Sequence, residues 1–177
     1  MTELEGAVLG VIWSRGPITA YGVLQRFLVS ATRGWSASTG AIYPAIRRLT
    51  ADGLVQATPA PGDKRSTRQL MLTSEGKAAL HDWLFELQDW MGGAVVDPVR
   101  TRMNYIGLLP RAEQLKLIDK AEENARSALA EIQRFVPDPT AHEQLGLKLA
   151  AVGARADVEA RLAWLKQVRA LISQGKK

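Results

Sequence analysis

A change of periodicity at Gly53 constrains the fold more than any other feature of the sequence. Before this glycine, apolar residues recur at the three- and four-residue spacing of amphipathic helices over 3–14, over 20–32 and from Ser38 onward. In the second of these helices, the predicted apolar face comprises Tyr21, Leu24, Leu28 and Ala31. Thr19 is a suitable N-cap for the second helix and Ser38 for the third, because their hydroxyls accept hydrogen bonds from free backbone N–H groups. Gly53 suits the left-handed residue that ends many helices. The first fifty or so residues are therefore predicted to form three helices.

The segments that follow are predicted to form two strands and a fourth helix. Residues 54–60 and 67–73 have the character of short strands, and the segment between them holds a proline, a glycine and charged side chains. Thr73 or Ser74 can cap the next helix. The predicted apolar face of that helix comprises Leu80, Trp83, Leu84, Leu87, Trp90 and Met91. Three helices, two strands and a helix in this order are typical of a winged helix-turn-helix domain, whose third helix enters the DNA major groove.

The predicted third helix, "STGAIYPAIRRL", has an unusual outward side. Its apolar stripe of Ile42, Ile46 and Leu49 is predicted to face the core. Small, aromatic and basic residues then face outward: Gly40, Tyr43, Pro44 and Arg47, with Arg48 at the margin. Such residues can approach phosphates and base edges, which predicts DNA binding. Because proline lacks a backbone N–H, the helix is expected to start late or to kink at this proline. The alternative is an ordinary amphipathic surface helix.

The turn between the two predicted strands is basic. Lys64, Arg65 and Arg68 lie in or beside it, where cations can reach DNA phosphates. Residues 33–77 hold seven Lys and Arg against three Asp and Glu, within a chain whose net charge is +5. Taken alone, a charged turn is equally compatible with a solvated loop. Together with the third helix, it favours a wing that contacts the DNA backbone.

The segment "GGAVVDP" marks the clearest boundary in the chain, because its glycines and Asp-Pro pair interrupt helical periodicity. We therefore expect a mainly α-helical protein with a winged helix-turn-helix DNA-binding domain over 1–92 and a helical dimerisation domain over 93–177. Within the second domain, 111–135 carries one apolar stripe. Residues 142–173 carry two: Leu145, Leu149, Val152 and Ala156, and also Val158, Leu162, Leu165, Val168 and Ile172.

A helix with two apolar lines needs two partners. If one line packs on 111–135, a second copy of the chain can bury the other and place two third helices about one DNA turn apart. The predicted dimer interface comprises Leu145, Leu149, Val158, Leu162, Trp164, Leu165 and Ile172. The alternative is a helical hairpin that folds back on the first domain.

The sequence contains few of the residue patterns that catalysis or membrane insertion requires. The chain has no cysteine, and its two histidines, His81 and His142, lie on separate segments without a metal-ligand pattern. No glycine-rich phosphate loop or paired-acid motif is present. The first residues lack the basic region of a signal peptide, and no apolar run is long enough to span a bilayer. We expect a cytoplasmic protein without catalytic activity, metal or cofactor.

Three stretches together resemble the PadR family of bacterial transcriptional regulators: "GPITAYGVLQRF", "WSASTGAIYPAIRRLTADGLV" and "LTSEGKAAL". That family has a Ser-x-Gly-Thr-Leu-Tyr-Pro-x-Leu-x-x-Leu helix and a wing that ends in Leu-Thr-x-x-Gly. The C-terminal stretches "MNYIGLLPRAEQ" and "EARLAWLKQVRALI" are similar to its longer members, which have a separate helical dimerisation domain. The tyrosine-proline pair of the third helix is the most specific element of this resemblance.

The resemblance implies a homodimer that binds a pseudo-palindromic operator in double-stranded DNA, usually as a repressor. By position it implies DNA contacts from Tyr21, Ser38, Thr39, Gly40, Tyr43, Pro44 and Arg47, and from Lys64 and Arg65 of the wing. It also implies release by an effector, which can be a small apolar or phenolic molecule. Trp35, Trp83, Trp90 and Trp164 are candidates to line such a pocket, although most tryptophans at helical spacing belong to a core or an interface. The alternative function is a winged-helix module for protein–protein interaction.

Overall fold

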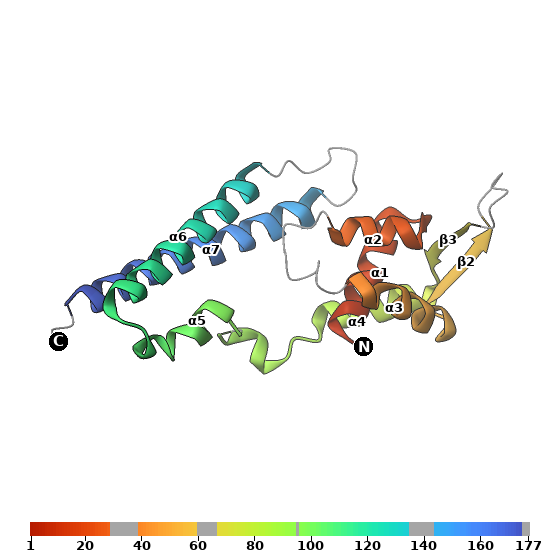
Figure 1. The fold of residues 1–177 in the computed structure, drawn as a ribbon. Coiled ribbons are helices and arrows are strands. Elements are labelled where there is room, and N and C mark those ends of the chain that lie inside the picture. The colour runs from red at the N-terminus through yellow and green to blue at the C-terminus, as the bar shows by residue number, and fades with distance from the viewer. Residues whose placement is uncertain (29–38, 60–66, 95, 135–143, 175–177) are drawn as a thin grey trace. The chain divides into compact units, whose positions relative to one another are not determined.

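The computed structural model describes residues 1–28, 39–59, 67–94, 96–134 and 144–174 (Figure 1). The chain forms two compact units, and the boundary between them lies between Gln88 and Asp89. We call Met1–Gln88 the N-terminal unit and the part that begins at Asp89 the C-terminal unit, and each is described by itself. The mainly helical fold with a small antiparallel sheet is the predicted one.

The N-terminal unit is a winged helix-turn-helix domain, as predicted. Its helices are α1 (Glu3–Arg15), α2 (Ala20–Leu28), α3 (Thr39–Ala51) and α4 (Ser74–Phe85), and its strands are β1 (Ile18–Thr19), β2 (Val55–Pro59) and β3 (Arg68–Leu72). The strands form one antiparallel sheet in the order β1-β3-β2, with β2 and β3 as the wing hairpin (Figure 1). Ala57 lies opposite Leu70 in that hairpin, which sets the register of the wing.

A single apolar core joins the four helices α1–α4 to the wing strands β2 and β3. It is built from one face of each element: Val8, Leu9, Ile12, Val23, Phe27, Ile42, Ala45, Ile46, Leu49, Val55, Leu70, Leu72 and Leu80. The side chain of Thr2 caps α1, and that of Thr19 accepts a hydrogen bond from the Gly22 N–H at 3.0 Å in the first turn of α2. The predicted role of Thr19 as a helix cap is confirmed.

The end of α3, the start of the wing and the start of α4 meet at one tight junction. Gly53 has φ +74°, the left-handed conformation predicted for it, and the chain then enters β2. The Thr73 hydroxyl donates to the Gly53 carbonyl at 2.8 Å and accepts from the Gly76 N–H at 2.9 Å. A Cβ on Gly76 would lie 1.9 Å from the Leu54 carbonyl oxygen. The wing is therefore fixed to α4 through backbone contacts that leave no room for a side chain.

Two apolar faces predicted from the sequence are wrong in part, although Leu24 of α2 and Leu80 and Trp83 of α4 do pack in or on the core. In α2 the buried residues are Val23 and Phe27, whereas Tyr21 and Leu28 are exposed. The predicted face of α4 extended beyond its end at Phe85, and Leu84 and Leu87 are exposed. Both segments carry apolar residues on more than one side, so that spacing alone does not identify the side that packs. The part of the second predicted helix beyond residue 28 lies outside the described residues.

Pro44 lies inside α3, which already begins at Thr39. The predicted late start of this helix is therefore wrong. The helix begins five residues before the proline, so the bond that the proline cannot donate is that to the Gly40 carbonyl in the first turn. Gly40 itself is exposed, with nothing within 4 Å of its Cβ position.

The C-terminal unit consists of helices only among its described residues. The short helices η2 (Asp89–Gly92), α5 (Pro98–Met103) and η3 (Ile106–Leu108) precede two long ones, α6 (Arg111–Arg134) and α7 (Gln144–Gln174). The start of α6 lies near the end of α7, since Arg111 donates to the Ser173 carbonyl, so the long helices run antiparallel. Ile118 and Ala121 of α6 form a core with Leu165 of α7. The residues packed around this core are Val99, Met103, Ile106, Trp164, Val168 and Ile172.

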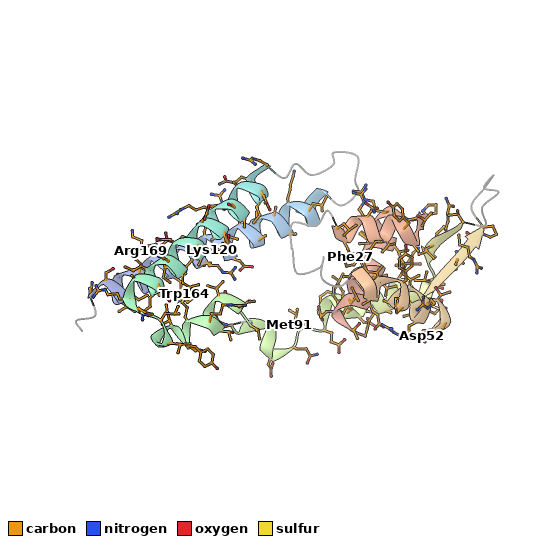
Figure 2. All side chains as sticks on the ribbon, in the orientation of Figure 1. Phe27, Asp52, Met91, Lys120, Trp164 and Arg169 are labelled. Carbon is orange, nitrogen blue, oxygen red and sulfur yellow. The ribbon has the colours of Figure 1, made fainter. Side chains whose placement is uncertain are left out.

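Ion pairs fix the edges of the C-terminal unit. Arg169 of α7 bonds to Asp119 at 2.6 Å and to Glu122 at 3.1 Å on α6, and Figure 2 shows Arg169 and Trp164 where these helices lie side by side. Asp97 caps α5 and also accepts from Arg161 of α7. In the described part of the chain, no helix is long and apolar enough to cross a membrane.

Candidate nucleic-acid interface

The α3 helix presents one buried and one exposed side, as predicted. Ile42, Ala45, Ile46 and Leu49 are buried in the core, with Ile42 fully inaccessible to solvent. This packing holds the opposite side of the helix out of the core. Tyr43, 41% exposed, lies on that side together with the exposed residues Gly40 and Arg47.

The N-terminal half of α3 combines small residues with two long polar side chains. Gly40 and Ala41 are exposed, so another backbone can approach the helix closely there. The hydroxyl of Tyr43 can donate to a phosphate, and Arg47 can bind a phosphate or the edge of a guanine. Arg47 forms no hydrogen bond or ion pair with the residues that the structure describes, so its guanidinium keeps its donors for a ligand. Ser38 and the side chain of Thr39 lie outside the described residues.

Tyr21 is exposed in the first turn of α2, the helix that precedes α3 in the helix-turn-helix. It does not enter the core face that sequence spacing assigned to it, because Val23 and Phe27 occupy that face. An exposed aromatic phenol at the start of this helix suits a phosphate contact, the role that the family resemblance implies.

Arg48 and Arg68, two further predicted DNA contacts, are engaged within the chain. The Nε of Arg48 donates to the Glu5 carboxylate of α1 at 2.8 Å. Arg68 of β3 donates to the Ala57 carbonyl of β2 at 2.9 Å and so ties the two wing strands together. The two basic residues of the wing turn, Lys64 and Arg65, lie outside the described residues.

Glu5 was not identified as a functional candidate from the sequence. The "TELE" stretch at residues 2–5 has the Thr-x-x-Glu pattern of a capping box, and both reciprocal hydrogen bonds of that box are present. The pattern predicts the cap but not the contact with Arg48, because that residue lies 43 positions further along the chain. Only the packing of α1 on α3 brings the two charges together.

The described residues offer no cluster of metal-ligating side chains. His81 is exposed and lies 3.4 Å from Asp82, its neighbour in sequence, while His142 lies outside the described part. Two of the tryptophans considered for a pocket are half-buried in the cores: Trp83 lies against Gly6, and Trp164 packs on the Leu165 cluster. Trp35 and the side chain of Trp90 lie outside the described residues.

The α7 helix divides its two apolar lines between a covered and an exposed side. Leu165 is fully buried against α6, and Trp164 and Ile172 pack on the same cluster. Val158 and Leu162 are half-buried. Leu145, Leu149 and Val152 remain 70%, 62% and 67% exposed in the single chain. We call these three residues the α7 stripe.

The N-terminal unit matches a known protein family. The model of the transcriptional regulator PadR-like family matches residues 8–82, from the middle of α1 to the last turn of α4. A curated relative, the negative transcriptional regulator PadR of Bacillus subtilis, is 29% identical over 134 residues, which are 75% of this chain and 72% of that protein.

Solved structures extend the similarity to both units. The crystal structure of Bacillus subtilis PadR in complex with operator DNA is 25% identical, with a TM-score of 0.80, and the match covers 97% of this chain and 99% of that one. The structure of the same regulator with p-coumaric acid is 23% identical, with a TM-score of 0.74 over 97% and 96% of the two chains. The PadR-like regulator BC1756 of Bacillus cereus shares the fold at 17% identity and a TM-score of 0.73, over 97% of each chain.

The sequence features and the fold lead to one assignment. The tyrosine-proline helix is α3 of a winged helix-turn-helix unit, and the family model covers that unit almost completely. The long α6 and α7 helices are included in the matches to solved regulators. The chain therefore belongs to the PadR-like family of transcriptional regulators.

Proposed function

We propose that this regulator binds an operator in double-stranded DNA and represses the adjacent genes in the cytoplasm. The observation that carries the proposal is the exposed side of α3, which contains Gly40, Tyr43 and Arg47. The residues on the opposite side of this helix are buried, and they hold the exposed side out of the core. The Bacillus subtilis relative is a negative transcriptional regulator whose structure with operator DNA has been solved, and both facts support the same function.

In the proposed complex, α3 enters the major groove by its N-terminal half. Arg47 reads a base edge or binds a phosphate there, and Tyr43 binds a phosphate. Gly40 and Pro44 let the helix approach the groove without bulky side chains. Around this centre, Tyr21, Ser38 and Thr39 contact the backbone, as do Lys64 and Arg65 of the wing turn.

We also propose that the regulator acts as a homodimer formed through its C-terminal unit. The α7 stripe supports this proposal, because three large aliphatic side chains in contiguous turns are exposed in the single chain. Leu165, Trp164 and Ile172 already pack within the chain, so Leu145, Leu149 and Val152 are the residues that we assign to the centre of the interface. A two-fold dimer would place two α3 helices on the halves of an inverted repeat.

We also propose that binding of a small-molecule effector releases the protein from its operator. The support is the solved structure of Bacillus subtilis PadR with p-coumaric acid, which makes phenolic acids the first class to test. The test is titration of p-coumaric acid into the operator complex, with release followed by fluorescence anisotropy. A complex unaffected at millimolar p-coumaric acid would exclude this compound as the effector.

The function is tested by selecting binding sites from random duplex DNA with the purified protein at roughly 0.15 M salt. We expect enrichment of an inverted repeat whose half-sites are about one helical turn apart. An Arg47→Ala variant carried through the same selection should enrich the repeat less strongly and show a relaxed preference at one base position. If the wild-type protein selects no sequence, with or without p-coumaric acid, operator binding is wrong and the interaction-module alternative is favoured.

A further inference from the structure

Glu5 of α1 is held at two points at once. Its Oε2 accepts from the Thr2 N–H at 3.0 Å, while the Thr2 hydroxyl accepts from the Glu5 N–H at 3.2 Å. Its Oε1 accepts from Nε of Arg48 at 2.8 Å. The Glu5 side chain is 14% exposed. The Thr2 amide, followed by the Arg48 guanidinium, lowers the pKa of Glu5, so the carboxylate is charged at neutral pH.

This ion pair lies at the edge of the contact between α1 and α3. Beside it the two helices share the apolar core, with Val8 and Leu9 of α1 in the same cluster as Ile42 and Leu49 of α3. Apolar contacts are not directional, so they exclude water without fixing the rotation of a helix about its axis. A charge-assisted hydrogen bond has a preferred length and angle, and it fixes that rotation.

Small rotations of α3 matter because its exposed side chains act at a distance from the axis. A rotation of about 15° moves a side-chain tip 5–6 Å from the axis by about 1.5 Å. Hydrogen bonds tolerate a distance range of only about 0.5 Å. Arg47 precedes Arg48 directly, so a rotation that loosens the Glu5 contact displaces Arg47 as well.

We infer that the Glu5–Arg48 ion pair sets the orientation of α3 for DNA recognition, so that Arg48 is a positioning residue and not a phosphate contact. This inference rests on the proposed operator binding. It replaces the expectation that Arg48 contacts DNA directly. The opposite possibility is that Glu5 sequesters Arg48 from a phosphate, and the two possibilities predict changes of opposite sign in the same variant.

The test uses the Glu5→Gln variant of the full chain. Glutamine retains the capping box, because its side-chain oxygen still accepts from the Thr2 N–H, but it removes the charge that holds Arg48. We expect operator affinity to fall about three- to tenfold with the thermal midpoint almost unchanged, since exposed ion pairs add little stability. The matched control is Glu3→Gln, an exposed first-turn acid, which should leave affinity unchanged. Tighter or unchanged operator binding by Glu5→Gln would overturn the inference.

The salt dependence of the Arg48→Gln variant identifies the role of the arginine. A positioning role predicts weaker operator binding with the same slope of log affinity against log salt as the wild type. A phosphate contact predicts a slope smaller by about one, and that outcome would refute the positioning role. The double variant should bind as weakly as either single variant, because both remove one interaction.

A measurement without DNA separates this inference from the proposed function. Amide hydrogen exchange in the free protein should be several-fold faster over the C-terminal half of α3 in Glu5→Gln than in the wild type. Unchanged exchange would show that the pair does not hold α3. If the wild type selects no operator, the proposed function fails, and the exchange result still decides whether the pair fixes the helix.

Discussion

Arg47 is the residue whose loss should most reduce sequence recognition. It is exposed on α3, on the side opposite the buried Ile42 and Leu49, and its replacement leaves the core intact. We expect Arg47→Ala to weaken operator binding by about 1 to 3 kcal/mol and to relax the preference at one base position. Fluorescence anisotropy with the operator and with single-base variants measures both effects. Equal loss on every sequence would instead assign Arg47 to a phosphate.

Gly76 is the residue at which adding a single methyl group should reduce the stability of the fold most. A Cβ there would meet the Leu54 carbonyl oxygen at 1.9 Å, and neither backbone can move without disturbing the Thr73 cap. We expect Gly76→Ala to lower the free energy of unfolding by about 2 to 3 kcal/mol despite the better helix propensity of alanine. Urea unfolding followed by circular dichroism measures this change in the free energy of unfolding.

Gly10 is the matched control for that substitution, because it also lies in a helix but has nothing within 4 Å of its Cβ position. Gly10→Ala should therefore raise the free energy of unfolding by roughly 0.5 to 1 kcal/mol. If both variants shift stability in the same direction, the close approach at Gly76 is not what determines its effect.

At the scale of elements, a single carboxylate adds a polar attachment of α5 to α7 to the apolar packing of Val99 and Met103. Asp97 accepts from the Val99 and Arg100 amides at 2.8 and 3.2 Å, and from Arg161 of α7 at 3.1 and 2.5 Å. Burial would raise the pKa of Asp97, but these amides and the Arg161 guanidinium together hold it below its ordinary value. A lowered pKa in the folded state contributes stability above the unfolded pKa, and protonation removes that contribution as the pH falls through the folded value.

The Asp97→Asn variant tests this attachment, since asparagine still caps a helix but carries no charge. At pH 7 we expect the free energy of unfolding of the variant to be about 1 kcal/mol lower than that of the wild type. The difference from the wild type should persist down to about pH 5 and shrink as the pH falls below the ordinary aspartate pKa of 3.8. Urea unfolding at several pH values checks both points. A difference that stays constant down to pH 3 would exclude the carboxylate as its source.

The elements of this chain were more predictable from sequence than their contacts. The two wing strands, the caps at Thr19 and Thr73 and the inward stripe of α3 follow from local patterns, and the structure contains them. The short strand β1 was not predicted from the sequence. The buried side of α2 was not predictable, because Leu28 is as apolar as the residues that pack and Tyr21 has a large aromatic ring, yet both are exposed. The Glu5–Arg48 pair and the close approach at Gly76 depend on segments distant in sequence, so no local pattern encodes them.

At the scale of the whole molecule, the proposed dimer makes operator recognition depend on α7. Leu149 of the α7 stripe is 62% exposed, whereas the side of the helix that contains Leu165 is covered by α6. An aspartate in the centre of the stripe would place a charge where two copies exclude water, which is costly without a partner charge. Leu149→Asp should therefore convert the protein from a dimer to a monomer without unfolding either unit.

Size-exclusion chromatography with light scattering measures that change. We expect the wild type at twice the chain mass of 19.3 kDa and Leu149→Asp at 19.3 kDa. Ala150→Asp is the control, because residue 150 is exposed but lies about 100° further around the helix. It should remain dimeric. The monomeric variant should lose most of its affinity for an inverted repeat while keeping its affinity for one half-site, since each α3 is unchanged. A Leu149→Asp protein that remains dimeric would move the subunit interface away from the α7 stripe.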